Sequence, residues 1–121
     1  MIPINIIEEA AFQTIRRGAT VISDDVRGAF VRAIEAELSP IAKKGLEDTY
    51  KSMGLAELRD KPACPDTGWP IFYIKMGNEA QIEGGFMALE EAVRNAVRRA
   101  TKAGYLRATM KHPLTRSEAH V

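Results

Sequence analysis

The stretch IEGGFMALEEAVRNAVRRATKA, residues 82–103, decides the fold of this 121-residue chain because it predicts the longest helix. Apolar side chains recur at helical spacing on one face of it; they are Phe86, Leu89, Val93, Ala96, Val97 and Ala100. Gly104 follows directly and predicts the end of the helix, since glycine is favoured just past a helix C-terminus. The pattern is typical of a helix that buries one side and exposes the other.

Upstream, the sequence predicts three further helices. The first covers about residues 5–17 and presents Ile7, Ala11 and Ile15 as one stripe, with Gly18 as a stop signal. The second covers about residues 24–38 and begins at an acidic cap, Ser23-Asp24-Asp25, suited to the positive end of the helix dipole. We expect its buried side to consist of Val26, Phe30, Val31 and Ile34.

The third helix begins at Ser39-Pro40, since proline is tolerated in the first turn, and Gly54 marks its end unless residues 55–58 add one more turn. Residues 59–70 contain three prolines and a glycine and predict a rigid, irregular loop. Residues 71–76 are β-branched and aromatic and predict a short strand. The predicted fold class is therefore mostly α (α+β), a single domain over residues 1–121 with one or two short strands after a Cys-containing loop.

Composition excludes several classes of protein. The net charge of +1 gives no broadly basic surface for nucleic acid. No apolar run approaches the roughly 20 residues of a membrane span, and the N-terminus lacks the basic start and cleavage site of a signal peptide. One cysteine excludes an internal disulfide. We therefore expect a cytoplasmic protein that binds neither nucleic acid nor membrane.

The single cysteine, Cys64, allows two interpretations. A lone cysteine is most often a small buried apolar residue. However, Cys64 lies in a proline-bracketed loop, Asp66 and Thr67 follow it closely, and Gly68 permits an unusual backbone turn. A rigid loop that holds a thiol, a carboxylate and a hydroxyl indicates a functional site.

The motif Cys64-Pro65-Asp66-Thr67-Gly68, followed by an apolar run, resembles the first cluster-ligand segment of class I fumarases and L-tartrate dehydratases. Residues 104–107 (GYLR) and 112–116 (HPLTR) resemble the next block of that family. One long helix separates the two blocks, as the family spacing requires. The resemblance covers nearly the whole chain and marks it as similar to the N-terminal part of the α component of an iron–sulfur hydro-lyase.

The resemblance implies a [4Fe-4S] cluster held by three cysteines, with Cys64 as one ligand, in an enzyme that reversibly adds or removes water on a C4-type dicarboxylate such as fumarate, malate or tartrate. It also implies that Asp66 is a catalytic and substrate-binding carboxylate, that Thr67 contacts the substrate, and that Arg107 binds a substrate carboxylate. Pro65 stands where the family usually has glutamine, so the identity of the dicarboxylate stays open.

The resemblance also implies that the chain is incomplete. The other two cluster cysteines lie in later parts of the family's α component, and the catalytic base and further binding residues belong to a β component. We therefore expect the rest of the α component and a β component or domain as partners in an oligomer, and no activity from this chain alone. A fragment of a longer chain, a split subunit and a degenerate relative are all compatible with this, and we favour the fragment.

Two alternatives stand beside the hydro-lyase. The chain could be a non-catalytic helical interaction module or degenerate relative in which Cys64 is buried and the loop only packs. A zinc site built on Cys64 and His112 is weaker, because zinc sites usually have four ligands. The other residues could also have purely structural roles. Asp66 could cap a turn, Arg107 could be a surface residue past a helix end, and His112 could be a loop residue.

Overall fold

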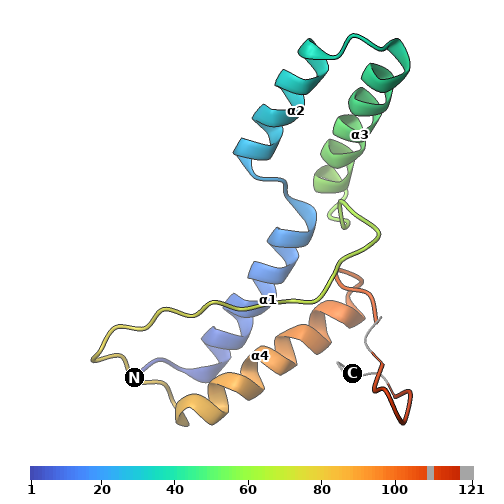
Figure 1. The fold of residues 1–121 in the computed structure, drawn as a ribbon. Helices are drawn as coiled ribbons and strands as arrows, with labels where there is room; N and C mark the ends of the chain where they lie inside the picture. The colour runs from blue at the N-terminus through green and yellow to red at the C-terminus, as the bar shows by residue number, and fades with distance from the viewer. Residues whose placement is uncertain (109–110, 118–121) are drawn as a thin grey trace.

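The computed structural model describes residues 1–108 and 111–117 and contains four helices in that part of the chain. They are α1 (Ile4–Thr20), α2 (Asp24–Ala36), α3 (Pro40–Leu58) and α4 (Gly85–Lys102). The helices α1 and α4 pack together, whereas α2 and α3 form a hairpin that projects away from them (Figure 1). The predicted mostly helical class is confirmed.

The core lies between α1 and α4. Ala96 and Ala100 are fully buried and, with Ala92, repeat every four residues, so they form one small-residue face along α4. Ala11 and Ile15 of α1 pack on that face, as the stripe in the sequence predicted. Small side chains on α4 let the two helix axes approach closely, and the larger side chains of α1 fill the space between them.

Charged and ring contacts reinforce the same pair of helices. Arg99 of α4 reaches Glu8 at 3.0 Å and Glu9 at 2.8 Å, both on α1. The guanidinium also lies 4.4 Å from the centre of the Phe12 ring. The hydrogen bond that Gln13 Nε2 donates to Glu9 at 2.7 Å, and then the one from Arg99, lower the pKa of Glu9 from its ordinary value. Arg99 thus adds polar and ring contacts to the apolar packing of α4 on α1.

Several predicted boundaries and faces are wrong. Gly18 lies inside α1, because hydrogen bonding continues to Val21, whose N–H donates to Arg17 O at 2.9 Å. Gly54 also lies inside α3, which includes the extra turn over residues 55–58. An interior glycine costs only about 1 kcal/mol relative to alanine, so neighbouring turns override it. The predicted buried positions Val26, Val31 and Phe86 are exposed.

The predicted strand over residues 71–76 is not part of any sheet. An isolated parallel bridge joins Ile2 to Ile82, and residues 71–76 take no part in it. Instead, the segment runs extended past α1 and α4, from the end of α3 towards the N-terminus (Figure 1). Phe72 packs against the core, whereas Trp69 and Tyr73 are exposed.

Two glycines fix the ends of α4. Gly84 has φ +74° at the start, where a Cβ atom would lie 2.7 Å from the Cβ of Ala88. Gly104 has φ +84° just past the end, and the Tyr105 N–H donates to Ala100 O at 2.9 Å. The left-handed conformation suits glycine at both places. The predicted stop at Gly104 is therefore confirmed, and the chain turns there towards the Cys64 loop.

Candidate functional site

The loop of residues 61–70 is attached to the C-terminal end of α1. The Ala63 N–H donates to Ala19 O at 2.9 Å, directly before Cys64. Cys64 is exposed, as is Asp66, while Thr67 is half-buried. Within the described residues Cys64 is therefore not buried, which contradicts the buried-cysteine part of that alternative.

Cys64, Asp66 and Thr67 share one hollow. Its volume is about 330 Å³, and its other wall is the junction between α1 and α2. That junction contributes Gly18, Ala19, Val21, Ile22 and Ser23. The loop thus places a thiol, a carboxylate and a hydroxyl on one wall, and Ser23 adds a second hydroxyl from the opposite element.

Arg107 is joined to the same loop from beyond α4. Its backbone N–H donates to Thr67 Oγ1 at 2.9 Å, and its Nη1 donates to Pro65 O at 3.0 Å. Arg107 does not itself line the hollow among the described residues. The structure therefore brings all four predicted site residues to one loop, but only Cys64, Asp66 and Thr67 to one hollow.

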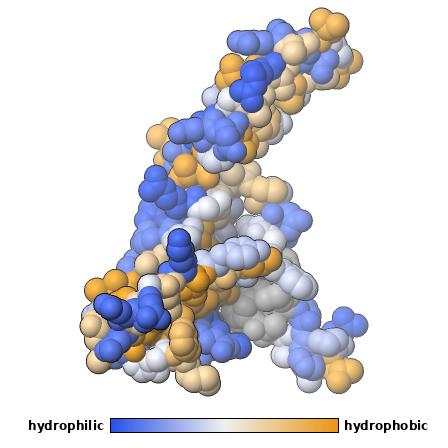
Figure 2. All heavy atoms as spheres, turned by 60° about the vertical axis from the view of Figure 1, so that its left-hand side comes forward, coloured by the Kyte–Doolittle hydropathy of each residue, from blue (hydrophilic) through white to orange (hydrophobic). Residues whose placement is uncertain are grey.

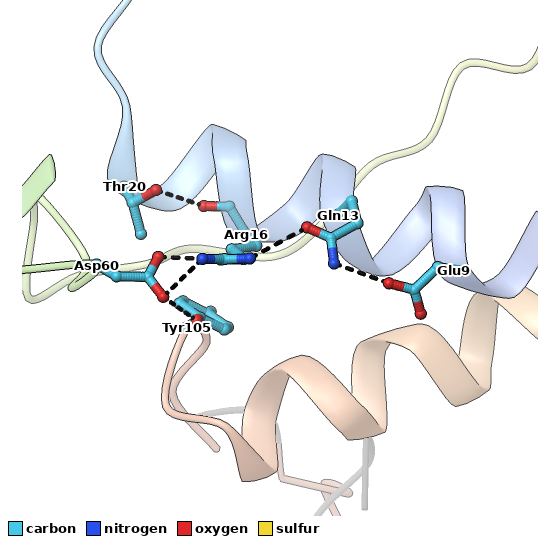
Figure 3. Close-up of polar contacts among 6 residues, drawn as sticks. All are labelled: Glu9, Gln13, Arg16, Thr20, Asp60 and Tyr105. Carbon is cyan, nitrogen blue, oxygen red and sulfur yellow. Dashed lines mark hydrogen bonds and ion pairs between the residues drawn. The ribbon is translucent and has the colours of Figure 1, made fainter.

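A polar cluster that the sequence did not reveal fixes this arrangement (Figure 3). Asp60 accepts two hydrogen bonds from Arg16, from Nε and Nη2, each at 3.0 Å. It also accepts one from the Tyr105 hydroxyl at 2.6 Å. Arg16 lies on α1, Asp60 follows α3, and Tyr105 follows α4. One carboxylate thus ties together the elements that lead into the loop and into Arg107.

The hydrogen bonds of this cluster shift the ionisation of its members. Those from Arg16 and then Tyr105 lower the pKa of Asp60, and the bond to Asp60 raises the pKa of Tyr105. Asp60 also has a positive φ of 51°, a conformation in which aspartate is enriched among non-glycine residues. An aspartate directly after a helix and before a proline-rich loop was the signal that sequence reasoning missed.

His112 has a local role. Its Nδ1 accepts hydrogen bonds from the N–H groups of Leu114 and Thr115, both at 3.2 Å. Over residues 1–108 and 111–117, no three His, Cys, Asp or Glu side chains form a group that could hold a metal ion. A zinc site on Cys64 and His112 therefore finds no ligand set there, and the loop interpretation of His112 is the better one.

The chemistry of Cys64 fits partial ligation of an iron–sulfur cluster. Thiolates are the usual ligands of such clusters, and Cys64 is exposed beside a hollow rather than enclosed by apolar side chains. It is also the single cysteine of the 121 residues. This chain can therefore supply one thiolate, and any further thiolates have to come from another polypeptide segment.

No helix of the described residues has the length and apolar content to cross a bilayer.

Comparison with known proteins adds a family. A family model described as "Fumarate hydratase (Fumerase)" matches residues 8–120. The chain is 32% identical over 110 residues to "Putative L(+)-tartrate dehydratase subunit alpha" of Methanocaldococcus jannaschii, which covers 91% of this chain and 38% of that protein. It is also 32% identical over 111 residues to "Putative fumarate hydratase class I" of Geobacillus stearothermophilus. This match covers 88% of the present chain and 20% of that protein. The chain thus spans well under half the length of these relatives.

Proposed function

The chain belongs to the fumarate hydratase family, and we propose that it forms part of a [4Fe-4S]-dependent hydro-lyase acting on a C4-type dicarboxylate. In this proposal residues 1–121 are one domain, the N-terminal part of the α component, in a reducing cytoplasm. The observation that carries the proposal is the shared hollow of Cys64, Asp66 and Thr67, with Arg107 bonded to the same loop.

Cys64 would hold the cluster as one of about three thiolate ligands. When bound, the cluster supplies a Lewis acid that withdraws electron density from the hydroxyl group leaving the substrate. The other thiolates would come from the rest of the α component. Both relatives are much longer than this chain, which supports a larger assembly. We therefore propose the rest of the α component and a β component as partners.

The loop residues would bind and orient the substrate. An ionised Asp66 only accepts hydrogen bonds, so it would hold a substrate hydroxyl or a water molecule by its proton. Thr67 accepts from the Arg107 N–H, and its own O–H can then donate to a carboxylate oxygen. The positive charge of Arg107 beside the loop would attract the dianionic substrate, and its planar fork matches a carboxylate.

The experiment is a hydratase and dehydratase assay on the complete, anaerobically reconstituted assembly. With malate or tartrate as the substrate, the rise in absorbance of the unsaturated product is followed. With fumarate as the substrate, the fall in absorbance of fumarate is followed. We expect Cys64→Ser to lower kcat by at least about 100-fold, because the cluster loses a ligand. Arg107→Lys should mainly raise KM, since lysine cannot grip a carboxylate with two parallel bonds.

Arg94→Lys is the matched control for the arginine change. Arg94 is on the exposed face of α4 and pairs with Glu90 at 2.7 Å, far in sequence from the loop. Its replacement should leave kcat and KM unchanged. Full activity in the Cys64→Ser assembly would overturn the proposal, and equal effects of the two arginine changes would remove Arg107 from it.

A further inference from the structure

The segment of residues 69–76 runs extended over the surface without a strand beside it (Figure 1). Within the described residues, none of its backbone N–H or C=O groups bonds to another backbone group. Just before it, Ala63 is bonded to α1, and just after it, Ala80 is bonded to Gly77. An extended run with free backbone groups is a ready template for the addition of a strand.

Its side chains already alternate as they do in a strand. Trp69, Ile71 and Tyr73 are 71%, 75% and 92% exposed. Phe72, between Ile71 and Tyr73, packs against the core, and Ile74, directly after Tyr73, is less exposed, at 53%. This two-residue period is the geometry of a strand with one covered face. The open face carries Trp69, Ile71 and Tyr73, with the exposed Lys75 at its end, and such aromatic and apolar side chains are typical of the centre of an interface.

We propose that residues 69–76 receive a β-strand from the polypeptide that completes the hydro-lyase. This inference rests on the proposed function, in which that polypeptide must supply the further thiolates, about two, that ligate the cluster together with Cys64. Cys64 is five residues from Trp69, a span of at most about 17 Å. The segment carrying the missing ligands therefore has to approach the very loop that continues into residues 69–76.

A second copy of this chain is a poorer occupant. It would bring only one more cysteine, its own Cys64, and that is too few for the cluster. The remaining polypeptide has ample length, since this chain matches only 38% of the M. jannaschii relative. A hollow of about 320 Å³, lined mainly by apolar residues such as Met76, Ile82 and Phe86, lies at the far end of the segment. It receives an apolar side chain of the incoming strand.

Amide hydrogen exchange tests this pairing directly. The probe is a chimera in which the chain replaces the matching 110 residues of the M. jannaschii relative, compared with the chain alone. In the chain alone, the amides of residues 69–76 exchange as fast as in an unstructured peptide. In the chimera, alternate amides of the segment slow by on the order of 100-fold. Amides of α4 around Ala96 stay equally protected in both, which verifies that the domain is folded.

Variants make the assignment specific. Ile71→Glu combined with Tyr73→Glu removes the protection in the chimera, because both side chains lie on the open face, where they would contact the neighbouring side chains of the incoming strand. Leu38→Glu is the control, since Leu38 is equally exposed but belongs to the turn between α2 and α3. A Cys64→Ser chimera keeps the protection although it lacks a cluster ligand, so a failure of the proposed chemistry is distinguishable from a failure of the pairing.

Two results overturn the inference. Exchange at residues 69–76 that is equally fast in the chimera shows that no strand is added. Protection that appears in the chain alone and rises with its concentration assigns the segment to a second copy instead.

Discussion

The two helix pairs of this chain differ in what lies between them. Between α1 and α4, Ala96 and Ala100 are completely buried, and Ile15 is nearly so. Neither α2 nor α3 has a buried residue, and the aromatic contact between them is Phe30 stacked on Tyr50, with ring centres 6.0 Å apart. Figure 2 shows apolar atoms exposed along this projecting hairpin. The first pair has a core, whereas the second has only a contact.

The candidate site depends on the pair that has the core. Ala63 is bonded to Ala19 of α1, Asp60 to Arg16 of α1, and Arg107 follows the end of α4. The hairpin of α2 and α3 contributes less to the site. Ser23, at the start of α2, lines the hollow, and the end of α3 leads into the loop. We therefore expect damage between α1 and α4 to disturb the site, and damage along the hairpin to leave it intact.

Overpacking provides the largest expected difference. Ala96→Leu adds three carbon atoms at a position with no exposed surface, and should lower the free energy of unfolding by about 2–3 kcal/mol. Ala33→Leu, on the exposed side of α2, should change it by less than about 0.5 kcal/mol. Urea denaturation of both variants measures this, and equal losses would erase the distinction between the two pairs.

Glycine substitutions should change stability in opposite directions. Gly84→Ala places a Cβ atom 2.7 Å from that of Ala88 at a positive φ, and should cost about 1–2 kcal/mol. Gly54→Ala, inside α3, meets open space and should stabilise the chain by up to about 1 kcal/mol. Thermal unfolding gives both signs. A stabilising Gly84→Ala would show that the start of α4 is not restricted in this way.

Acid should weaken the Asp60 cluster. The pKa of Asp60 is lowered in the folded chain, first by Arg16 and then by Tyr105, so folding favours the ionised form. The resulting stability is present above the ordinary aspartate pKa and is lost as pH falls through the lowered one. Asp60→Asn should reduce this acid sensitivity and lower the melting temperature near neutral pH.

Asp48→Asn is the control for that carboxylate. Asp48 pairs with Lys44 at 2.7 Å on the exposed surface of α3, where such a pair contributes little. Its replacement should leave the pH profile of the melting temperature unchanged. If Asp60→Asn behaved in the same way, the cluster would not hold the loop.

The tip of the hairpin should give the smallest effect. Leu38→Gln removes an exposed apolar side chain between α2 and α3, and should change the free energy of unfolding by less than about 0.5 kcal/mol. The melting temperature of the isolated chain measures it. A large loss would indicate that the hairpin has its own apolar core after all.

Local sequence signals identified the helices because those signals act locally. The acidic cap before α2 and Gly104 after α4 both mark observed ends. Gly18 and Gly54 were wrongly predicted as helix ends, because the hydrogen-bonded turns on both sides tolerate one glycine. Val26 and Val31 show the limit of periodicity. It predicts which face of a helix is apolar, but not whether anything in the same chain covers that face.

The proximity of Cys64, Asp66 and Thr67 could be predicted from the sequence, but the contacts that support their loop could not. Cys64, Asp66 and Thr67 are adjacent in sequence, so one loop carries them wherever it lies. Arg16, Asp60 and Tyr105 are far apart in the chain, and no local pattern links them. For the same reason the strand at residues 71–76 was overpredicted, since the sequence favours an extended backbone but does not reveal what pairs with it.

The most direct test of the central claim is the iron content and visible absorption of the complete enzyme after anaerobic reconstitution, with and without Cys64→Ala. With Cys64 present, we predict about four iron atoms per assembly and the brown absorption of a [4Fe-4S] cluster. With alanine at this position, iron and colour should be lost while the α1–α4 pair stays folded, because Cys64 is exposed. An alanine variant with the same iron content and the same spectrum would contradict the account.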